Sequence, residues 1–399
     1  MSKAAFNAAI PLMKHIQSHG FEAYFVGGAV RDFYLGRTIN DVDIATSATP
    51  DEIESIFDHT IPVGKAHGTI NVVWNNNNYE VTTFRTEGLY EDHRRPTNVH
   101  FVRSLYEDVA RRDFTINAMA MDTEFKLYDY FNGCLDLNNH CIRTVGNAQT
   151  RFTEDALRII RGLRFQSQLN FDIEKKTYKA MSSCIEDINF LSIERIMTEL
   201  EKLLMGSGIS KAFKAIIDLK IMSHIPYFKF FKWQNMMLNK PLTLPQFLAF
   251  LHLFEGEKEG IKLLKLSKQT LKEAERLTQA VRNLQQIHSK ADLKIWVYDY
   301  GNVATDIFYL KSLFDTHQIQ LANPLIFNPN SISEIRQGMP ILVRKDININ
   351  GKILMEVLNE PSGPWLKRTL RQIECAIVTN EINNRQTEIV EWVKENVEI

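Results

Sequence analysis

Hydrophobic and polar residues alternate in two different ways near the start of the chain, and each pattern predicts a different element. Apolar residues recur at helical spacing over residues 3–18, which predicts an amphipathic helix. Alternation over residues 41–46, DVDIAT, predicts a strand. The apolar stretch AYFVGGAV, residues 23–30, predicts a second strand that runs into a glycine turn.

The same region contains signals for a second helix and a hairpin. Residues 48–57, ATPDEIESIF, predict the start of a helix with Thr49 or Asp51 near its N-cap. The segments GTINVVW and YEVTTFR, residues 68–74 and 79–85, flank four asparagines, which predicts a hairpin with an asparagine-rich turn. The first 150 residues therefore predict a mixture of helices and strands.

From about residue 150 the strand pattern disappears and helical periodicity replaces it. The helical segments are 153–169, 192–205, 209–219, 244–256, 267–284 and 363–378. The predicted fold class is α+β, with an N-terminal head of mixed or antiparallel sheet and helices, followed by an all-helical remainder. We expect a catalytic head over residues 1–150, a helical neck over 151–210 and a helical body and tail over 211–399.

The composition is that of an ordinary globular chain, and it excludes several classes of protein. Hydrophobic residues make up 44% and charged residues 24% of the 399. The formal net charge is −1, so a nucleic acid would need a local basic surface. The four cysteines form no CxxC pair, which favours reduced thiols over a disulfide framework or a zinc site. No membrane segment and no signal peptide are evident, so we expect a cytoplasmic protein.

Asp41 and Asp43 form the first candidate chemical site. In a strand, side chains two residues apart point to the same face, so the two carboxylates project together. Such a pair can hold hard cations, and Mg²⁺ favours one or two protein carboxylates together with substrate phosphates. Glu80 on the later hairpin strand could supply a third carboxylate. The alternative is a strand edge whose charges are only solvated.

The surrounding residues favour a phosphate-binding site. Gly27 and Gly28 allow the backbone to approach a phosphate closely, and Arg31 follows as a cationic partner. A second basic stretch, ARRDFTINA, places Arg111 and Arg112 where we expect a helix to begin, a position that attracts anions. A plain charged helix cap is the alternative for this stretch.

Three arginines recur at intervals of three residues in the stretch EDALRIIRGLR. They are Arg158, Arg161 and Arg164, and on one helix they would follow a slowly turning face beside a buried apolar stripe. Asp155 would then be a neighbour of Arg158, and the commoner meaning of this spacing is a surface salt bridge. A carboxylate beside a guanidinium also matches the amino donor and ring acceptor of cytosine and adenine, and mismatches uracil and guanine.

Four stretches occur in an order that resembles one enzyme family. They are GGAVRDFYLGRTINDVDIAT (27–46), RRDFTINA (111–118), DYFNGCLDL (129–137) and EDALRIIRGLRF (154–165). They resemble the motifs of bacterial class II tRNA nucleotidyltransferases, the CCA-adding enzymes of the polymerase β-like superfamily. Weaker similarity extends over residues 349–385. The resemblance implies a polymerase β-like head and attack of the tRNA 3′-hydroxyl on the α-phosphorus of CTP or ATP, with release of pyrophosphate.

The resemblance also implies roles for ten residues. The ligands of the Mg²⁺ cofactor are Asp41 and Asp43, and the third catalytic carboxylate is Glu80. The residues that contact the nucleotide are Gly28, Arg31, Arg112, Asp155, Arg158, Arg161 and Arg164. Within this set, Asp155 and Arg158 read the incoming base without a nucleic-acid template.

The polar segment 87–96 bears on which nucleotides are added. In the resembled family a loop at this place, with a pattern like Asp92 and Arg95, is needed for the switch from C to A addition. Its presence argues against an enzyme that adds only the two cytidines. Three alternatives stay open: an enzyme restricted to CC or A addition, a poly(A) polymerase of the same superfamily, and an RNA-binding protein with an inactive head. The expected partners are the acceptor arm and 3′ end of tRNA, CTP and ATP, and a homodimer is compatible with the sequence.

Overall fold

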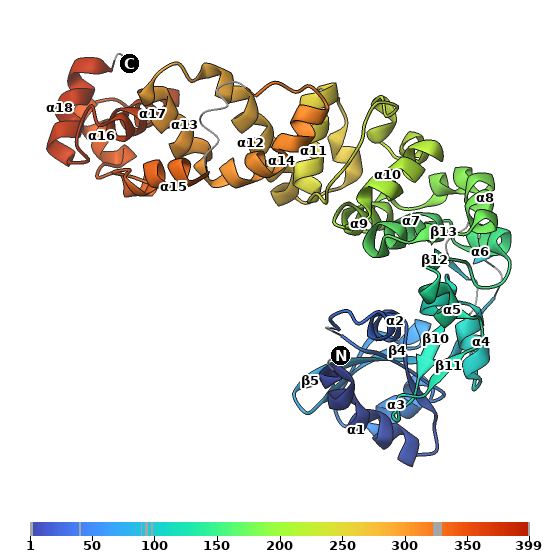
Figure 1. Cartoon of the computed structure of the whole chain (residues 1–399). Coiled ribbons are helices and arrows are strands. Elements are labelled where there is room, and N and C mark those ends of the chain that lie inside the picture. The colour runs from blue at the N-terminus through green and yellow to red at the C-terminus, as the bar shows by residue number, and fades with distance from the viewer. Residues whose placement is uncertain are drawn as a thin grey trace. The chain divides into compact units, whose positions relative to one another are not determined.

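The chain forms two compact units in a computed structural model that describes residues 3–39, 41–88, 90–91, 95–96, 99–321 and 329–397. Unit 1 comprises Met1–Leu242 and Glu259–Lys265, and unit 2 comprises Thr243–Lys258 and Leu266–Ile399. Figure 1 labels the helices and several of the strands. The finer division into head, neck and body at residues 150 and 210 stays a prediction.

Unit 1 is built on a seven-stranded mixed sheet with the order β11-β10-β1-β2-β5-β4-β3. Figure 1 labels β4, β5, β10 and β11 of this sheet. Its strands are β1 (Ala23–Val26), β2 (Asp43–Thr46), β3 (Thr60–Gly64), β4 (Thr69–Trp74), β5 (Asn77–Thr83), β10 (Met119–Met121) and β11 (Leu127–Asp129). Only β2 and β5 are parallel neighbours; the other pairs in this sheet are antiparallel. The predicted mixed or antiparallel sheet is confirmed.

Three pairs of short strands accompany the main sheet. They are β6 (Arg85–Glu87) with β9 (Val99–Phe101), β7 (Tyr90–Glu91) with β8 (Arg95–Pro96), and β12 (Cys141–Ile142) with β13 (Asp172–Ile173). The pair β7 and β8 falls within the segment that the sequence predicts as a polar loop. Asp92 lies outside the described residues, and so does the side chain of Arg95.

Local sequence signals account for the hairpin and for one helix start. Asn75 and Asn76 join β4 to β5 with φ angles of 50° and 62°, the left-handed conformation that two-residue hairpin turns require. Thr49 is the N-cap of α3 (Pro50–Ile56), and it exchanges hydrogen bonds with Glu52 in a capping box. The predictions of an asparagine turn and of a cap at Thr49 are both confirmed.

Helices cover both faces of the main sheet. The other head helices are α1 (Ala4–Ser18), α2 (Gly28–Tyr34), α4 (Leu105–Ala110) and α5 (Gly133–Asn138). Phe6 of α1 packs edge-to-face on Phe25 of β1, with ring centroids 4.7 Å apart. The next residue, Val26, points to the opposite face and joins a buried cluster with Leu105 and Val109 of α4. The sequence predicts only a turn at the start of α2, because this seven-residue helix begins with glycine and lacks a side-chain cap.

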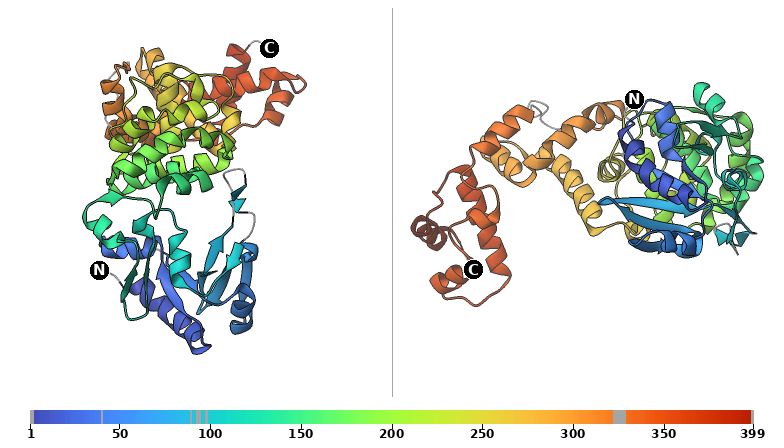
Figure 2. Two further views of the ribbon diagram at one scale, coloured as in Figure 1. Left: turned by 90° about the vertical axis from the view of Figure 1, so that its right-hand side faces the viewer. Right: turned by 90° about the horizontal axis from the view of Figure 1, so that it is seen from below.

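Helices dominate the rest of unit 1, as Figure 2 shows in the green part of the chain. They are α6 (Ala148–Glu154), α7 (Leu157–Leu169), α8 (Lys175–Ser183), α9 (Ile193–Leu204) and α10 (Ile209–Asp218). Apart from the two-residue strand β13, the described residues after 150 contain no strand, so the predicted loss of strands is confirmed. Close packing of α7 on α9 and α10 brings residues of α7 and α9 side by side.

Unit 2 consists of helices in the residues that the structure describes. They are α11 (Leu244–Glu255), α12 (Lys268–Asn283), α13 (Lys290–Tyr300), α14 (Ala304–Thr316), α15 (Pro329–Gln337), α16 (Gly351–Leu358), α17 (Pro364–Thr379) and α18 (Gln386–Asn396). A buried cluster that includes Leu354, Ile373 and Val393 joins α16, α17 and α18. Within the described ranges, no helix of either unit is long and apolar enough to cross a membrane.

Candidate active site

Strand register brings three predicted site residues to one end of the main sheet. Val26 pairs with Asp43 in the antiparallel pair β1 and β2, so Gly27 leaves β1 beside the start of β2. Ile44 pairs with Val81 in the parallel pair β2 and β5, so Asp43 and Glu80 precede paired residues on neighbouring strands. The hydrogen-bonding register thus places Asp43 and Glu80 next to each other.

A polar cavity of about 680 Å³ opens at this end of the sheet. Its size is in the range of small-molecule binding sites. The basic side chains that line it are Arg31, Arg85, Arg111, Arg112, Arg158, Arg161, Arg164 and Arg195, and the acidic ones are Asp43, Glu80, Asp113 and Asp155. Eight arginines against four carboxylates give the cavity a positive excess, although the whole chain has a net charge of −1. A nucleoside triphosphate has the matching charge.

The acidic corner of the cavity combines carboxylates whose charges disfavour one another. Desolvation at the cavity wall raises the pKa of Asp43, the guanidinium of Arg112 opposes that shift, and the nearby charge of Asp41 adds to it. Desolvation and the charge of Asp43 likewise raise the pKa of Glu80. A bound cation would relieve this repulsion, and a donor set made only of carboxylate oxygens suits Mg²⁺.

The protein by itself supplies few ligands to such a cation. In the described part of the chain, no group of three or more histidine, cysteine, aspartate or glutamate side chains is placed to hold a metal ion. Asp41 precedes β2, is exposed and does not line the cavity. An ion held by Asp41 and Asp43 would therefore take its other ligands from substrate phosphates and water, which is the usual mode of Mg²⁺ binding.

A glycine separates the acidic corner from the nearest arginine. Gly27 has φ 70° and ψ −136°, a conformation that side chains strongly disfavour. A Cβ atom here would lie 3.5 Å from both Asp43 Oδ2 and Arg112 Nη1. Glycine thus keeps the space between carboxylate and guanidinium open. Gly28 follows at the start of α2, where a Cβ would lie 3.6 Å from Arg31 Nη2.

Buried polar groups hold the arginines that face this corner. Asp108 is 1% exposed and accepts hydrogen bonds from Arg111 Nη2 at 2.7 Å and Arg112 Nη2 at 3.1 Å. Burial alone would raise the pKa of Asp108, but the two guanidinium groups lower it. Arg31 Nη1 donates to Asn117 Oδ1 at 2.7 Å. The donor directions of these arginines are therefore fixed before any ligand binds.

The helix start expected at Arg111 and Arg112 is wrong. Arg111 is the C-cap of α4, and Arg112 follows it. The next helical segment is a three-residue 3₁₀ turn, Thr115–Asn117, which has no long array of free N–H groups to offer an anion. The basic character of this stretch therefore comes from its side chains.

The middle arginines of α7 are held by two carboxylates from other elements. Arg161 donates to Asp113 Oδ2 from Nε at 2.8 Å and approaches it from Nη2 at 2.7 Å. Burial would raise the pKa of Asp113, but Arg161 and further hydrogen bonds lower it to about 2. Arg164 Nε lies 2.6 Å from Glu199 Oε2 on α9. The predicted arginine face of α7 thus lines the cavity and is anchored from behind.

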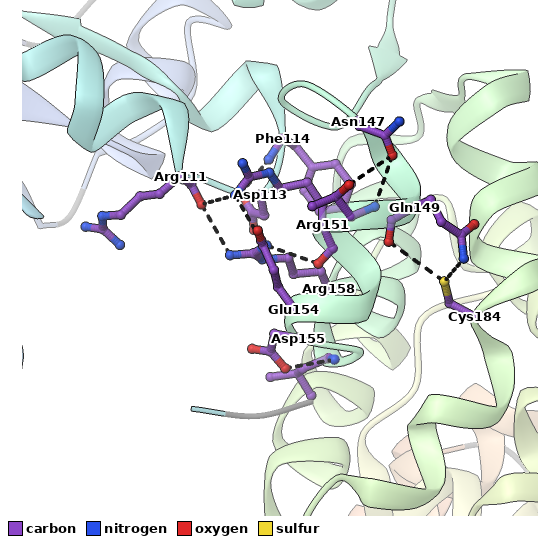
Figure 3. A network of polar contacts seen from close by, with 12 residues as sticks. Arg111, Asp113, Phe114, Asn147, Gln149, Arg151, Glu154, Asp155, Arg158 and Cys184 are labelled. Carbon is purple, nitrogen blue, oxygen red and sulfur yellow. Dashed lines mark hydrogen bonds and ion pairs between the residues drawn. The ribbon is translucent and has the colours of Figure 1, made fainter. Parts of the chain in front are cut away.

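The placement of Asp155 and Arg158 on one helix is wrong. The helical periodicity that the sequence shows across 153–169 is broken, because Asp155 has an extended backbone between α6 and α7. Arg158 instead donates to Glu154 and to the backbone carbonyls of Arg151 and Arg111, and Figure 3 shows Asp155 apart from these contacts. The alternative of a salt bridge between Asp155 and Arg158 does not describe the structure either.

The structure brings most of the predicted site residues together. Nine of the ten line the cavity: Gly28, Arg31, Asp43, Glu80, Arg112, Asp155, Arg158, Arg161 and Arg164. Asp41 lies beside it, close enough to influence the pKa of Asp43.

The sequence analysis missed Asn117, Arg195 and Glu199. One signal pointed to Glu199, because it falls on the apolar stripe of α9, where a carboxylate needs a cationic partner.

Comparisons with known proteins agree with this architecture. Residues 23–143 match the family model of the poly A polymerase head domain, residues 170–231 match a probable RNA and SrmB-binding site of polymerase A, and residues 246–393 match a putative tRNA nucleotidyltransferase domain 2. The fold and the site together define a nucleotidyltransferase of the polymerase β type, a class that is generally metal-dependent.

Individual relatives narrow the class to one family. The chain is 50% identical to the CCA-adding enzyme of Staphylococcus haemolyticus and 52% identical to that of Staphylococcus aureus strain RF122, each over 100% of both chains. It also matches the crystal structure of the Bacillus stearothermophilus CCA-adding enzyme in complex with CTP, with 33% identity, a TM-score of 0.82 and coverage of 99% of this chain and 98% of that one. The chain belongs to the CCA-adding enzymes.

Proposed function

We propose that this chain adds and repairs the 3′-terminal CCA of tRNA, using CTP and ATP and releasing pyrophosphate. The observation that carries the proposal is the arginine-lined cavity of unit 1. It combines an acidic corner suited to Mg²⁺ with eight arginines and a carboxylate, Asp155, that can accept from a base. Full-length similarity to CCA-adding enzymes supports the same reaction.

Asp41 and Asp43 would hold the metal ion. Bound there, Mg²⁺ would favour ionisation of the attacking hydroxyl and stabilise negative charge on the leaving pyrophosphate. Arg112 lies at the gap that Gly27 keeps open and Arg31 lies beside Gly28, and their guanidinium groups would bind the triphosphate as charge-assisted donors. Because buried partners already fix both arginines, little reorganisation is needed when the phosphate charge develops.

The remaining predicted residues would select the nucleotide. Asp155 would accept a hydrogen bond from the amino group that cytosine and adenine share, and Arg158 would donate to the adjacent ring nitrogen. Arg158 is bound to Glu154 and two carbonyl oxygens, so it has to exchange at least one of these contacts to reach a base. Arg161 and Arg164 would make additional contacts with the nucleotide.

The helical part of the chain would bind the RNA. We assign the acceptor arm of tRNA to the helical body and tail, residues 211–399, through contacts with the phosphate backbone that do not depend on sequence. The segment around Asp92 and Arg95 would take part in the switch from C to A addition. A cytoplasmic location and a homodimer stay predictions.

One assay tests the proposal. Purified chain, tRNA that lacks its 3′ end, Mg²⁺ and each nucleotide, alone or combined, give products that a sequencing gel resolves. We expect two C additions with CTP alone and completion of CCA with CTP and ATP together. Long A tails would indicate a poly(A) polymerase, products that stop after CC a CC-adding enzyme, and no incorporation an inactive RNA-binding protein.

A further inference from the structure

The carboxylate of Asp155 is held in one orientation by two donors. Its Oδ1 atom accepts from the backbone N–H of Leu157 at 3.1 Å. Its Oδ2 atom accepts from Nη2 of Arg195 at 2.7 Å. A carboxylate oxygen has two acceptor positions, so each oxygen keeps one for a ligand in the cavity that Asp155 lines.

The side chain that fixes Oδ2 lines the same cavity as Asp155. Arg195 lies on α9, and its guanidinium donates to Asp155 and to no other residue among those that the structure describes. The two side chains are 30% and 17% exposed, so water screens their attraction only in part. Arg158, which the sequence spacing nominates as the partner of Asp155, is occupied elsewhere.

A second contact shows that α9 supports this wall of the cavity as a whole. Glu199 lies one turn after Arg195 on α9, and it is 6% exposed. Its Oε2 atom is 2.6 Å from Arg164 Nε, and its Oε1 atom is 3.6 Å from Arg161 Nη1. Helix α9 therefore anchors side chains of the cavity wall at two successive turns. The cation Arg195 makes the first of these contacts, and the anion Glu199 makes the second.

We propose that Arg195 is a positioning residue for base selection, which holds the Asp155 carboxylate so that its free acceptor positions face the incoming base. This inference rests on the proposed function. A base with an amino donor meets the fixed acceptor, whereas the O4 atom of uracil meets it acceptor against acceptor. Without Arg195 the carboxylate can rotate about its side-chain torsions, so it loses the direction on which this discrimination depends.

The test compares variants of Arg195 with a matched control on the same helix. Arg195→Gln removes the charge, Arg195→Lys keeps the charge and one donor direction, and Lys202→Gln removes one charge from an exposed position of α9. Each variant is made in the wild-type chain and in an Asp155→Ala background. The measurements are kcat and KM for CTP and UTP on tRNA lacking its 3′ end, and equilibrium binding of CTP and UTP without tRNA.

We expect Arg195→Gln to lower the CTP-to-UTP ratio of kcat/KM by about tenfold or more, because it removes a hydrogen bond between charged groups. This decrease should arise mainly from a higher KM for CTP. The ratio of the equilibrium binding affinities for CTP and UTP should fall in parallel. Arg195→Lys should restore part of the ratio, and Lys202→Gln should leave it unchanged. In the Asp155→Ala background, Arg195→Gln should have no further effect on the ratio.

Two outcomes would overturn the inference. One is a binding ratio that stays at the wild-type value in Arg195→Gln. The other is an equal loss of discrimination with and without Asp155, since Arg195 would then act on the nucleotide or the tRNA directly. If Arg195→Gln fails to fold, Arg195→Lys supplies the same comparison. Absence of CTP incorporation by the wild-type chain would instead refute the proposed function.

Discussion

Replacement of Asp113 by asparagine should weaken unit 1 by an amount that the structure allows to be calculated. Asp113 is 8% exposed and accepts from the guanidinium of Arg161, the side chain of Asn117 and the backbone of Phe114. These contacts lower its pKa from 3.8 to about 2. One pKa unit corresponds to about 1.4 kcal/mol, so the ionised carboxylate contributes about 2 kcal/mol to the free energy of unfolding.

The sign of the pKa shift gives the pH dependence. Because folding lowers the pKa of Asp113, its contribution is complete above 3.8 and is lost as the pH falls through about 2. The difference between the wild type and Asp113→Asn should therefore be full at pH 7 and roughly halved at pH 3. Asp172→Asn is the matched control, because Asp172 forms an exposed ion pair with Lys211 at 2.8 Å. Exposed pairs contribute about 0–1 kcal/mol.

The assay is urea unfolding followed by circular dichroism at pH 7 and pH 3. Hydrogen exchange read on peptides identifies the transition in which α7 opens, which separates unit 1 from unit 2. A loss below about 0.5 kcal/mol at pH 7, or an equal loss at pH 7 and pH 3, would refute the reasoning. An effect of Asp172→Asn as large as that of Asp113→Asn would refute it too.

Three further predictions concern the reaction. Alanine at Asp92 or Arg95 should leave CC addition largely intact and impair the final A; equal loss of C and A addition would exclude a role in switching. Asp155→Ala should lower the use of CTP and ATP and reduce the CTP-to-UTP ratio of kcat/KM by about tenfold or more, and an unchanged ratio would place base selection elsewhere. Glu80→Gln should raise the Mg²⁺ concentration needed for half-maximal rate several-fold, because Glu80 adds negative charge beside Asp43; an unaltered Mg²⁺ dependence would remove Glu80 from the metal site.

Sequence reasoning predicted the parts of the site that depend on local spacing. The hairpin pattern correctly placed Glu80 in the same sheet as Asp43, whereas the strand predicted over residues 41–46 begins only at Asp43, so Asp41 lies before it. The threefold spacing of the arginines in α7 predicted one basic face, and all three line the cavity. These features follow from backbone geometry within a few residues, so no tertiary information is needed.

Sequence reasoning missed one long-range contact and two helix boundaries. The partner of Asp155 is Arg195, which is 40 residues away, and no local pattern connects the two. The break between α6 and α7 carries neither proline nor glycine, so the periodicity appeared continuous through Asp155. The charges of Arg111 and Arg112 suggested a helix start, but the buried Asp108 of α4 holds both at a helix end.

The same carboxylate site, formed by Asp41 and Asp43, is expected to perform both C and A addition. The most direct measurement is the single-turnover rate of Asp43→Asn on two substrates, a tRNA that lacks CCA, supplied with CTP, and a tRNA that ends in CC, supplied with ATP. Asp41→Asn serves as a second variant of the same site. Both rates should fall in parallel by about a hundredfold or more, because the chemistry is shared and the fold is unchanged. Loss of C addition with A addition retained, or more than a few per cent of wild-type activity on both substrates, would contradict it.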